Sequence, residues 1–142
     1  MSALVGVDSL RNDAANVFHT GSYWYSAGPM AAAIATLGEW QRLDAPRLLG
    51  ETGRKLNDGL IRIAKSHGYT RTDTGGPCMA HCRIPDDETM MLHQRWCAEC
   101  TRRGAYFAPH HNWFVCAAME EADIKKTLNV ASECFKLTAK KF

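Results

Sequence analysis

The fold is decided by residues 46–66, which read PRLLGETGRKLNDGLIRIAKS. Apolar residues recur in this stretch at spacings of three, four and seven, which is the pattern of a helix with one apolar face. The residues of that face are Leu48, Leu49, Leu56, Leu60, Ile61 and Ile63. Asp44 is placed to cap the helix, Pro46 suits its first turn, and His67-Gly68 ends it. The sequence therefore predicts one long helix that packs on a core.

The segments after this helix alternate between extended and helical patterns. Residues 69–85 mix β-compatible and polar residues around a Gly75-Gly76-Pro77 turn. The elements expected next are a helix that opens at residues 85–88 and ends at residues 102–104, strands at 106–107 and 113–117, and a final helix from residue 120. One face of that final helix carries Ile124, Leu128, Ala131 and Phe135. This order predicts an α+β fold, with helices packed on a small, mainly antiparallel sheet.

The segment before residue 45 is too short to form a layer of its own. The apolar residues 3–7 predict a buried strand, residues 8–15 a helical turn, and residues 29–43 a helix with Met30, Ile34 and Leu37 on one face. A single buried strand needs neighbours that pair its backbone groups. We therefore expect this segment either to join the α+β layer or to have partners outside this chain.

Composition excludes several classes of protein. Of 142 residues, 46% are hydrophobic and 23% are charged, so the chain is able to bury a core, and the net charge of +2 comes without a basic block that would favour nucleic acid. No apolar run approaches the roughly 20 residues of a membrane-spanning helix. The first residues, MSALVGVDSLRND, do not resemble a signal peptide. We therefore expect a cytoplasmic protein whose six cysteines are free thiols.

Four of the cysteines form two close pairs, Cys78 with Cys82 and Cys97 with Cys100. Zinc prefers four such ligands in a tetrahedron, and close pairs of this kind are its usual sign in a sequence. The residues around the second pair, WCAECTRR, instead indicate a helix, where free cysteine commonly serves as a small buried hydrophobe. The helical interpretation is favoured, and a small zinc-binding protein is kept as an alternative.

The second candidate site is the loop in residues 19–33, HTGSYWYSAGPMAAA. Thr20, Gly21 and Ser22 offer hydroxyl groups and unobstructed backbone N–H donors, which suit a phosphate. The aromatic residues 23–25 could line a flat ligand or a subunit interface, or they could cap the core of an ordinary loop. The residues alone leave both interpretations open. His110-His111, in a loop between two expected strands, is a further candidate for binding metal or substrate.

Two long stretches of the chain resemble one enzyme family. Residues 19–40, HTGSYWYSAGPMAAAIATLGEW, resemble the segment of class III, fold-type I aminotransferases in which a Gly-Thr loop precedes a proline and a small-residue helix. Residues 104–135, GAYFAPHHNWFVCAAMEEADIKKTLNVASECF, are similar to the end of the same proteins. Within the family, the branch of glutamate-1-semialdehyde aminomutase and its aminotransferase relatives is the most similar. The resemblance covers essentially the whole chain.

The resemblance implies a fragment of a longer, pyridoxal-phosphate-dependent enzyme. Residues 1–45 would be the end of the cofactor-binding large domain, and residues 46–142 the complete small domain. Gly21-Ser22 would match the family's Gly-Thr, which contacts the cofactor phosphate across a homodimer, with Thr20 as the fallback. The lysine that forms a Schiff base with the cofactor would lie upstream, since the first lysine here is Lys55 in the long helix.

These implications give a specific expectation of function. The parent enzyme would transfer an amino group between small-molecule partners, as a transaminase or an aminomutase. The resemblance assigns no catalytic residue to this chain, so we expect the fragment alone to be inactive. Besides the zinc alternative, a non-catalytic module that dimerises through the aromatic loop is kept as a second alternative.

Overall fold

A computed structural model describes residues 5–19, 21–22 and 26–139. The chain divides into two compact units, Met1–Asp44 and Ala45–Phe142, which we call the N-terminal unit and the C-terminal unit and describe separately. No helix among the described residues is long and apolar enough to span a membrane.

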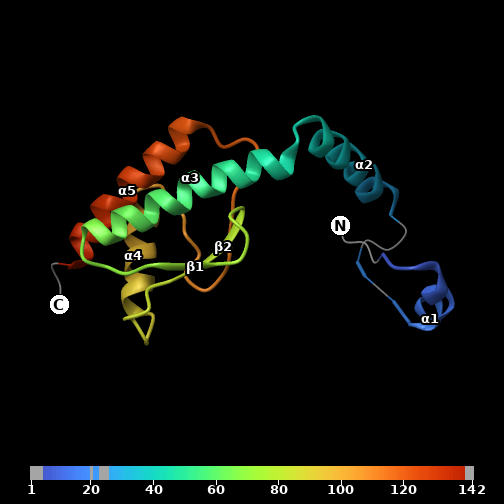
Figure 1. Ribbon diagram of the computed structural model, residues 1–142, viewed down its shortest axis with the longest axis horizontal. Coiled ribbons are helices and arrows are strands. Elements are labelled where there is room, and N and C mark those ends of the chain that lie inside the picture. The colour runs from blue at the N-terminus through green and yellow to red at the C-terminus, as the bar shows by residue number, and fades with distance from the viewer. Residues whose placement is uncertain (1–4, 20, 23–25, 140–142) are drawn as a thin grey trace. The chain divides into compact units, whose positions relative to one another are not determined.

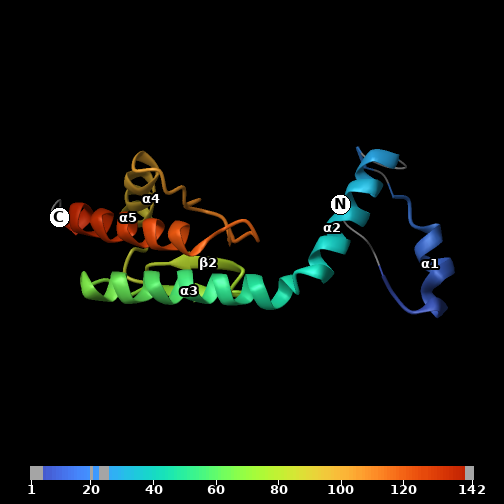
Figure 2. The same cartoon turned by 90° about the horizontal axis from the view of Figure 1, so that it is seen from above.

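The C-terminal unit is an α+β layer, as the sequence predicts. Its elements in chain order are α3 (Ala45–Ser66), β1 (Thr72–Thr74), β2 (Met79–Arg83), α4 (Met91–Arg102), β3 (Trp113–Phe114) and α5 (Glu121–Ala139). Helices α3 and α5 lie side by side in both views (Figures 1 and 2) and make the most extensive helix–helix contact of the unit. Helix α4 packs on α5, and β2 contacts α3.

Helix α3 confirms the long amphipathic helix predicted for residues 46–66. Leu56, Leu60 and Ala64 are buried on its inner face. Ile61, which the sequence placed on the same stripe, is 37% exposed, because it follows Leu60 directly and a helix turns successive side chains by about 100°. The helix stops where Gly68 takes a φ of +83°, a conformation that glycine adopts without steric cost.

A three-stranded antiparallel sheet, in the order β1-β2-β3, lies beside α3. Thr72 pairs with Arg83 across the β1–β2 hairpin, and Ala80 pairs with Trp113 across β2–β3. Ala80 and Cys82 are buried, whereas Met79 and Arg83 are exposed, as the period of two requires. The predicted strand at 106–107 is wrong, and the one predicted for 113–117 spans two residues, because residues 105–108 and 115–117 form no ladder with β2.

Helix α4 begins later than predicted, at Met91 instead of residues 85–88. Residues 85–90 form turns, and Met90 takes a φ of +57°, which separates this segment from the helix. The acidic run nevertheless caps the helix, since the Asp87 carboxylate accepts a hydrogen bond of 2.8 Å from the backbone N–H of His93. The predicted end at 102–104 is confirmed, with Gly104 at a φ of +85°.

The core of the C-terminal unit is centred on Trp96, which is 1% exposed. The centroid of its ring system lies 4.9 Å from the ring centroids of both Phe107 and Phe135, and its indole N–H donates a hydrogen bond of 3.3 Å to the Ala131 carbonyl. Pairs of aromatic rings at this separation stabilise a core beyond the area that they bury. Helices α4 and α5 and the segment after α4 therefore meet on one side chain.

The N-terminal unit contains a 3-10 turn, Asp8–Leu10, and two helices, α1 (Arg11–Asn16) and α2 (Ala27–Arg42). None of its described residues is buried. Met30, Ile34 and Leu37, predicted to share a face of the helix, are 44%, 73% and 60% exposed. Residues 5–7 of the predicted strand form no strand, and residues 3–4 lie outside the described residues. The described part of this unit has no core of its own.

A close contact between α3 and the hairpin turn yields a first prediction. A Cβ added at Gly53 would lie 2.1 Å from the carbonyl oxygen of Pro77, and Asn57 donates a hydrogen bond to that same oxygen at 3.0 Å. Because backbone must move to admit the methyl group, we expect Gly53→Ala to lower the free energy of unfolding by about 2 kcal/mol in urea titration.

Gly50→Ala is the matched control in the same helix. A Cβ there would meet the guanidinium group of Arg54 at 3.4 Å, and a flexible side chain is able to give way. Since alanine favours helix over glycine, we expect this variant to gain up to about 1 kcal/mol. Equal effects of the two substitutions would contradict the close packing of α3 on the turn.

Candidate functional site

The predicted phosphate-binding residues lie in the loop between α1 and α2. Gly21 and Ser22 are exposed, and a side chain at Gly21 would meet no atom within 4 Å. Thr20 and the aromatic residues 23–25 lie outside the described residues. The loop therefore presents a backbone that a ligand is able to approach closely, followed directly by a hydroxyl group.

Helix α2 follows this loop at once. Ser26 is its N-cap residue and makes no side-chain cap hydrogen bond, so it leaves the first N–H groups of the helix to other acceptors. Such groups, with the positive end of the helix dipole, favour anions. An exposed hydroxyl and an unobstructed backbone are donors of the type that a phosphate ester requires.

The cysteines occupy the positions expected of small core residues. Cys82, Cys97 and Cys100 are buried, Cys78 is half-buried, and the pair in α4 lies on the helix as WCAECTRR predicted. No group of three or more potential metal ligands of the His, Cys, Asp or Glu type comes together among the described residues. The geometry of this part of the chain therefore gives the zinc alternative no support.

Burial also makes four of the six thiols poor ligands and nucleophiles. Desolvation raises the pKa of Cys82 and of Cys97 to about 12 and raises the pKa of Cys100 and Cys134 as well. The thiolate is the form that binds metal and attacks electrophiles. At neutral pH these four thiols are therefore protonated.

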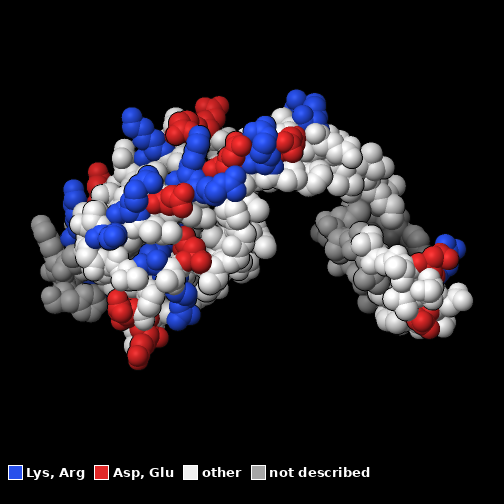
Figure 3. All heavy atoms as spheres, in the orientation of Figure 1, with Lys and Arg blue, Asp and Glu red and all other residues white. Residues whose placement is uncertain are grey.

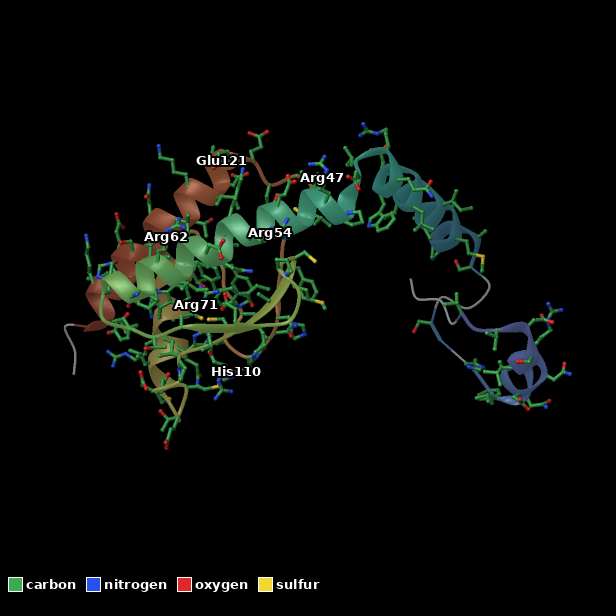
Figure 4. All side chains as sticks on the ribbon, viewed as in Figure 1. Arg47, Arg54, Arg62, Arg71, His110 and Glu121 are labelled. Atoms are coloured by element: carbon green, nitrogen blue, oxygen red, sulfur yellow. The ribbon has the colours of Figure 1, made fainter. Side chains whose placement is uncertain are left out.

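The loop that carries the two candidate histidines is tied to the sheet. Trp113 donates its indole N–H to the Ala108 carbonyl at 2.8 Å, and Asn112 donates from its amide to the Met79 carbonyl at 3.2 Å. His110, labelled in Figure 4, and His111 are both exposed on this loop, and Nδ1 of His111 lies 3.1 Å from the Asn112 carbonyl oxygen. The loop therefore holds the two rings at the surface.

A buried ion pair among the described residues was not predicted from the sequence. Arg71, labelled in Figure 4, is 7% exposed, and its Nε donates to Asp73 at 2.8 Å, while Nη2 donates to the other carboxylate oxygen at 3.1 Å. The residues stand two apart and point to the same face of an extended segment. The spacing of two residues between Arg71 and Asp73 was the signal in the sequence that they could pair. The sequence did not show that this face of the segment is buried.

Charges on the visible surface are mixed. Figure 3 shows basic side chains along α3 interleaved with acidic ones. Arg47 pairs with Glu51 at 3.1 Å, and Lys55 of α3 pairs with Glu121 of α5 at 2.7 Å. Exposed pairs of this kind contribute little to stability, and their mixture of signs does not form a basic patch on this face.

Comparisons with known proteins find similarity to one third of a longer enzyme. No family model matches it. Along all of its 142 residues, the chain is 34% identical to an aminopentol aminotransferase from Sphingopyxis macrogoltabida. The chain is a homologue of part of an aminotransferase. It spans 34% of the length of this relative.

A solved structure agrees with this aminotransferase relationship. The chain matches the pyridoxal phosphate (PLP) internal aldimine form of the FumI protein from Sphingopyxis sp. MTA144 with a TM-score of 0.88 and 33% sequence identity. The match covers 97% of this chain and 33% of FumI. Both the resemblance to aminotransferases and the α+β fold class are thereby confirmed, and the solved relative is a PLP protein.

The burial of the thiols yields a second prediction. We expect an aromatic disulfide reagent at pH 8 to label the exposed Cys116 quickly in the native chain and to leave Cys82, Cys97, Cys100 and Cys134 unlabelled until urea is added. Cys116→Ser is expected to remove the fast phase.

Metal analysis of the same sample supplies the control for this prediction. Rapid labelling of the α4 thiols, or stoichiometric zinc that protects Cys78, Cys82, Cys97 and Cys100 together, would contradict the packing described above and would favour the zinc alternative.

Proposed function

We propose that this chain is the C-terminal part of a class III, fold-type I aminotransferase that depends on PLP. In this proposal residues 1–45 end the large, cofactor-binding domain, and residues 46–142 form the small domain. The observation that carries it is the match over the whole chain in sequence, at 34% identity, and over 97% of it in structure, with a TM-score of 0.88. The reaction is the transfer of an amino group between a small-molecule donor and a small-molecule acceptor.

The surface of the N-terminal unit supports this assignment. Its helix α2 exposes Met30, Ile34 and Leu37 on one face, and none of the unit's described residues is buried. A contiguous apolar face of this kind is stabilised when another surface covers it. The remaining two thirds of the enzyme would supply that cover.

The residues of the exposed loop fit the phosphate of the cofactor. Gly21 allows close approach of the backbone, and the Ser22 hydroxyl is free to donate a hydrogen bond to a phosphate oxygen. When bound, PLP supplies an electron sink that stabilises a carbanion at the carbon bearing the amino group. In the proposed homodimer, this loop contributes phosphate contacts to the neighbouring subunit's site.

The lysine that anchors the cofactor is assigned to the rest of the enzyme. The described lysines, at 55, 65, 125, 126 and 136, are all exposed on helices of the C-terminal unit. We therefore propose that the 142 residues alone have no transaminase activity.

The name of the relative supports intermolecular transfer over an aminomutase reaction, and an amino-polyol is the first amino donor to assay. A cytoplasmic location completes the proposal.

A third prediction tests the role of Ser22. In the longer enzyme that contains this chain, we expect Ser22→Ala to weaken PLP binding about tenfold, because one charge-assisted hydrogen bond to the phosphate is lost. The measurement is the dissociation constant of PLP from equilibrium titration of the apoenzyme, followed by absorbance.

Ser26→Ala is the matched control, since Ser26 is an exposed serine at the end of the same loop and makes no side-chain cap hydrogen bond. We expect its PLP affinity to remain within about twofold of the unmodified enzyme. Equal PLP affinity in the Ser22→Ala variant would show that the phosphate assignment is wrong.

A further inference from the structure

The C-terminal unit contains a buried polar cluster, separate from the exposed loop discussed above. Its first member is Arg71, whose side chain is 1% exposed and which binds Asp73 through Nε and Nη2. The Arg71 guanidinium carbon lies 4.9 Å from the centroid of the Trp113 ring, a cation–π contact. The pair with Asp73 leaves the remaining nitrogen, Nη1, for another partner.

The second member is His93 of α4, which is 2% exposed. Its ring is within 8° of parallel to Trp113, with a centroid distance of 6.2 Å, and its Nε2 lies 3.7 Å from Sγ of Cys97. Burial, followed by the charge of Arg71, lowers the pKa of His93 to about 4, so the ring is neutral at pH 7. Arg71 and His93 thus both contact the same indole ring.

Each of these residues has one buried nitrogen without a hydrogen-bond partner among the described residues, Nη1 of Arg71 and Nδ1 of His93. A buried polar atom left unpaired costs about 1–3 kcal/mol, and more when the group is charged. Native proteins satisfy such atoms, commonly with an internal water that makes two to four hydrogen bonds. Two orphaned atoms beside one ring therefore point to a shared ligand.

We infer that Arg71 Nη1 and His93 Nδ1 together bind one internal water molecule against Trp113. The water accepts a hydrogen bond from Arg71 and donates one to His93 Nδ1. This arrangement fixes the tautomer of His93, with the proton on Nε2, where it points at Cys97. The positive charge of Arg71 favours the same tautomer, because the cation attracts a nitrogen lone pair and repels an N–H group.

Charge decides between water and a small anion. Asp73 already neutralises Arg71, and the His93 ring is neutral, so an anion would add an unpaired negative charge to a buried site. Burying an unpaired charge costs much more than burying a hydrogen-bonded neutral molecule. Water supplies both the acceptor and the donor that the two nitrogens require, with no added charge.

The bound water has a structural consequence for the loop that carries His110 and His111. Arg71 and His93 contact the Trp113 ring, and Trp113 in turn holds Ala108 by its indole N–H. The water thereby links Arg71, in the segment before β1, to His93 of α4. Both residues contact Trp113, whose side chain closes the loop. The water site thereby positions this loop.

The direct test is long-range ¹H–¹⁵N NMR of the histidine rings in the 142-residue chain at pH 7, combined with water-selective NOE spectra. We expect Nδ1 of His93 to give the shift of an unprotonated nitrogen, Nε2 that of a protonated one, and a resident water to show NOEs to the His93 and Trp113 rings. A proton on Nδ1, or no resident water at these rings, would overturn the inference.

Two variants of His93 test the same site, because the bound water determines which of the two has the larger folding equilibrium constant. Asparagine and leucine have the same shape, but His93→Asn places an amide oxygen at the branch where Nδ1 stood, whereas His93→Leu places a methyl group there. With a water to bind, the folding equilibrium constant of His93→Asn should exceed that of His93→Leu by about tenfold. In a dry pocket the order reverses, because the amide is buried unpaired, and that reversal would also overturn the inference.

Leu60 provides the control, since it is fully buried in α3 and has no orphaned polar atom. Leu60→Asn is expected to lower the folding equilibrium constant at least tenfold, which shows the ordinary preference for leucine in this core. If both His93 variants fail to fold, the NMR measurement on the unmodified chain decides alone.

Discussion

The C-terminal unit depends on the packing of the Trp96 indole. This side chain is almost fully buried, touches Phe107 and Phe135, and donates its N–H to a backbone carbonyl of α5. Its large apolar area and its satisfied polar atom together fix how α4 lies against α5. The Phe107–Trp113 contact, with centroids 4.4 Å apart, extends the same cluster to the sheet. The layer therefore has one aromatic centre that helices and strands share.

Periodic patterns predicted the parts of the fold that this centre organises. Ile124, Ala131 and Phe135 are buried as their spacing in α5 indicated, and Leu60 is buried in α3. The predictions failed where a tertiary contact, and not the local sequence, determines the structure. Asp87 caps α4 from a preceding turn, so the helix starts later than the acidic run suggested. The burial of Arg71 depends on Trp113, which lies far along the chain, and no local pattern reports it.

The cysteine pairs and the exposed loop differed in how much of each site the sequence could predict. Helix propensity and the usual burial of free cysteine predicted that the cysteines in WCAECTRR are core residues. The structure places both on the inner face of α4. Gly21 and Ser22 were singled out by residue type, and the structure adds that both are exposed. The chain covers about one third of both relatives, and the proposed phosphate site would draw its other residues from the remaining two thirds.

We propose that the N-terminal unit is part of a larger aminotransferase, whereas the C-terminal unit has its own core. Hydrogen exchange of the 142-residue chain, followed by mass spectrometry with and without the remaining two thirds of the enzyme, tests it most directly. We expect α3, α4 and α5 to be protected from exchange in both samples, whereas α2 exchanges rapidly alone and slowly in the complete enzyme. Protection of α2 in the isolated chain equal to that of α3 would contradict this proposal.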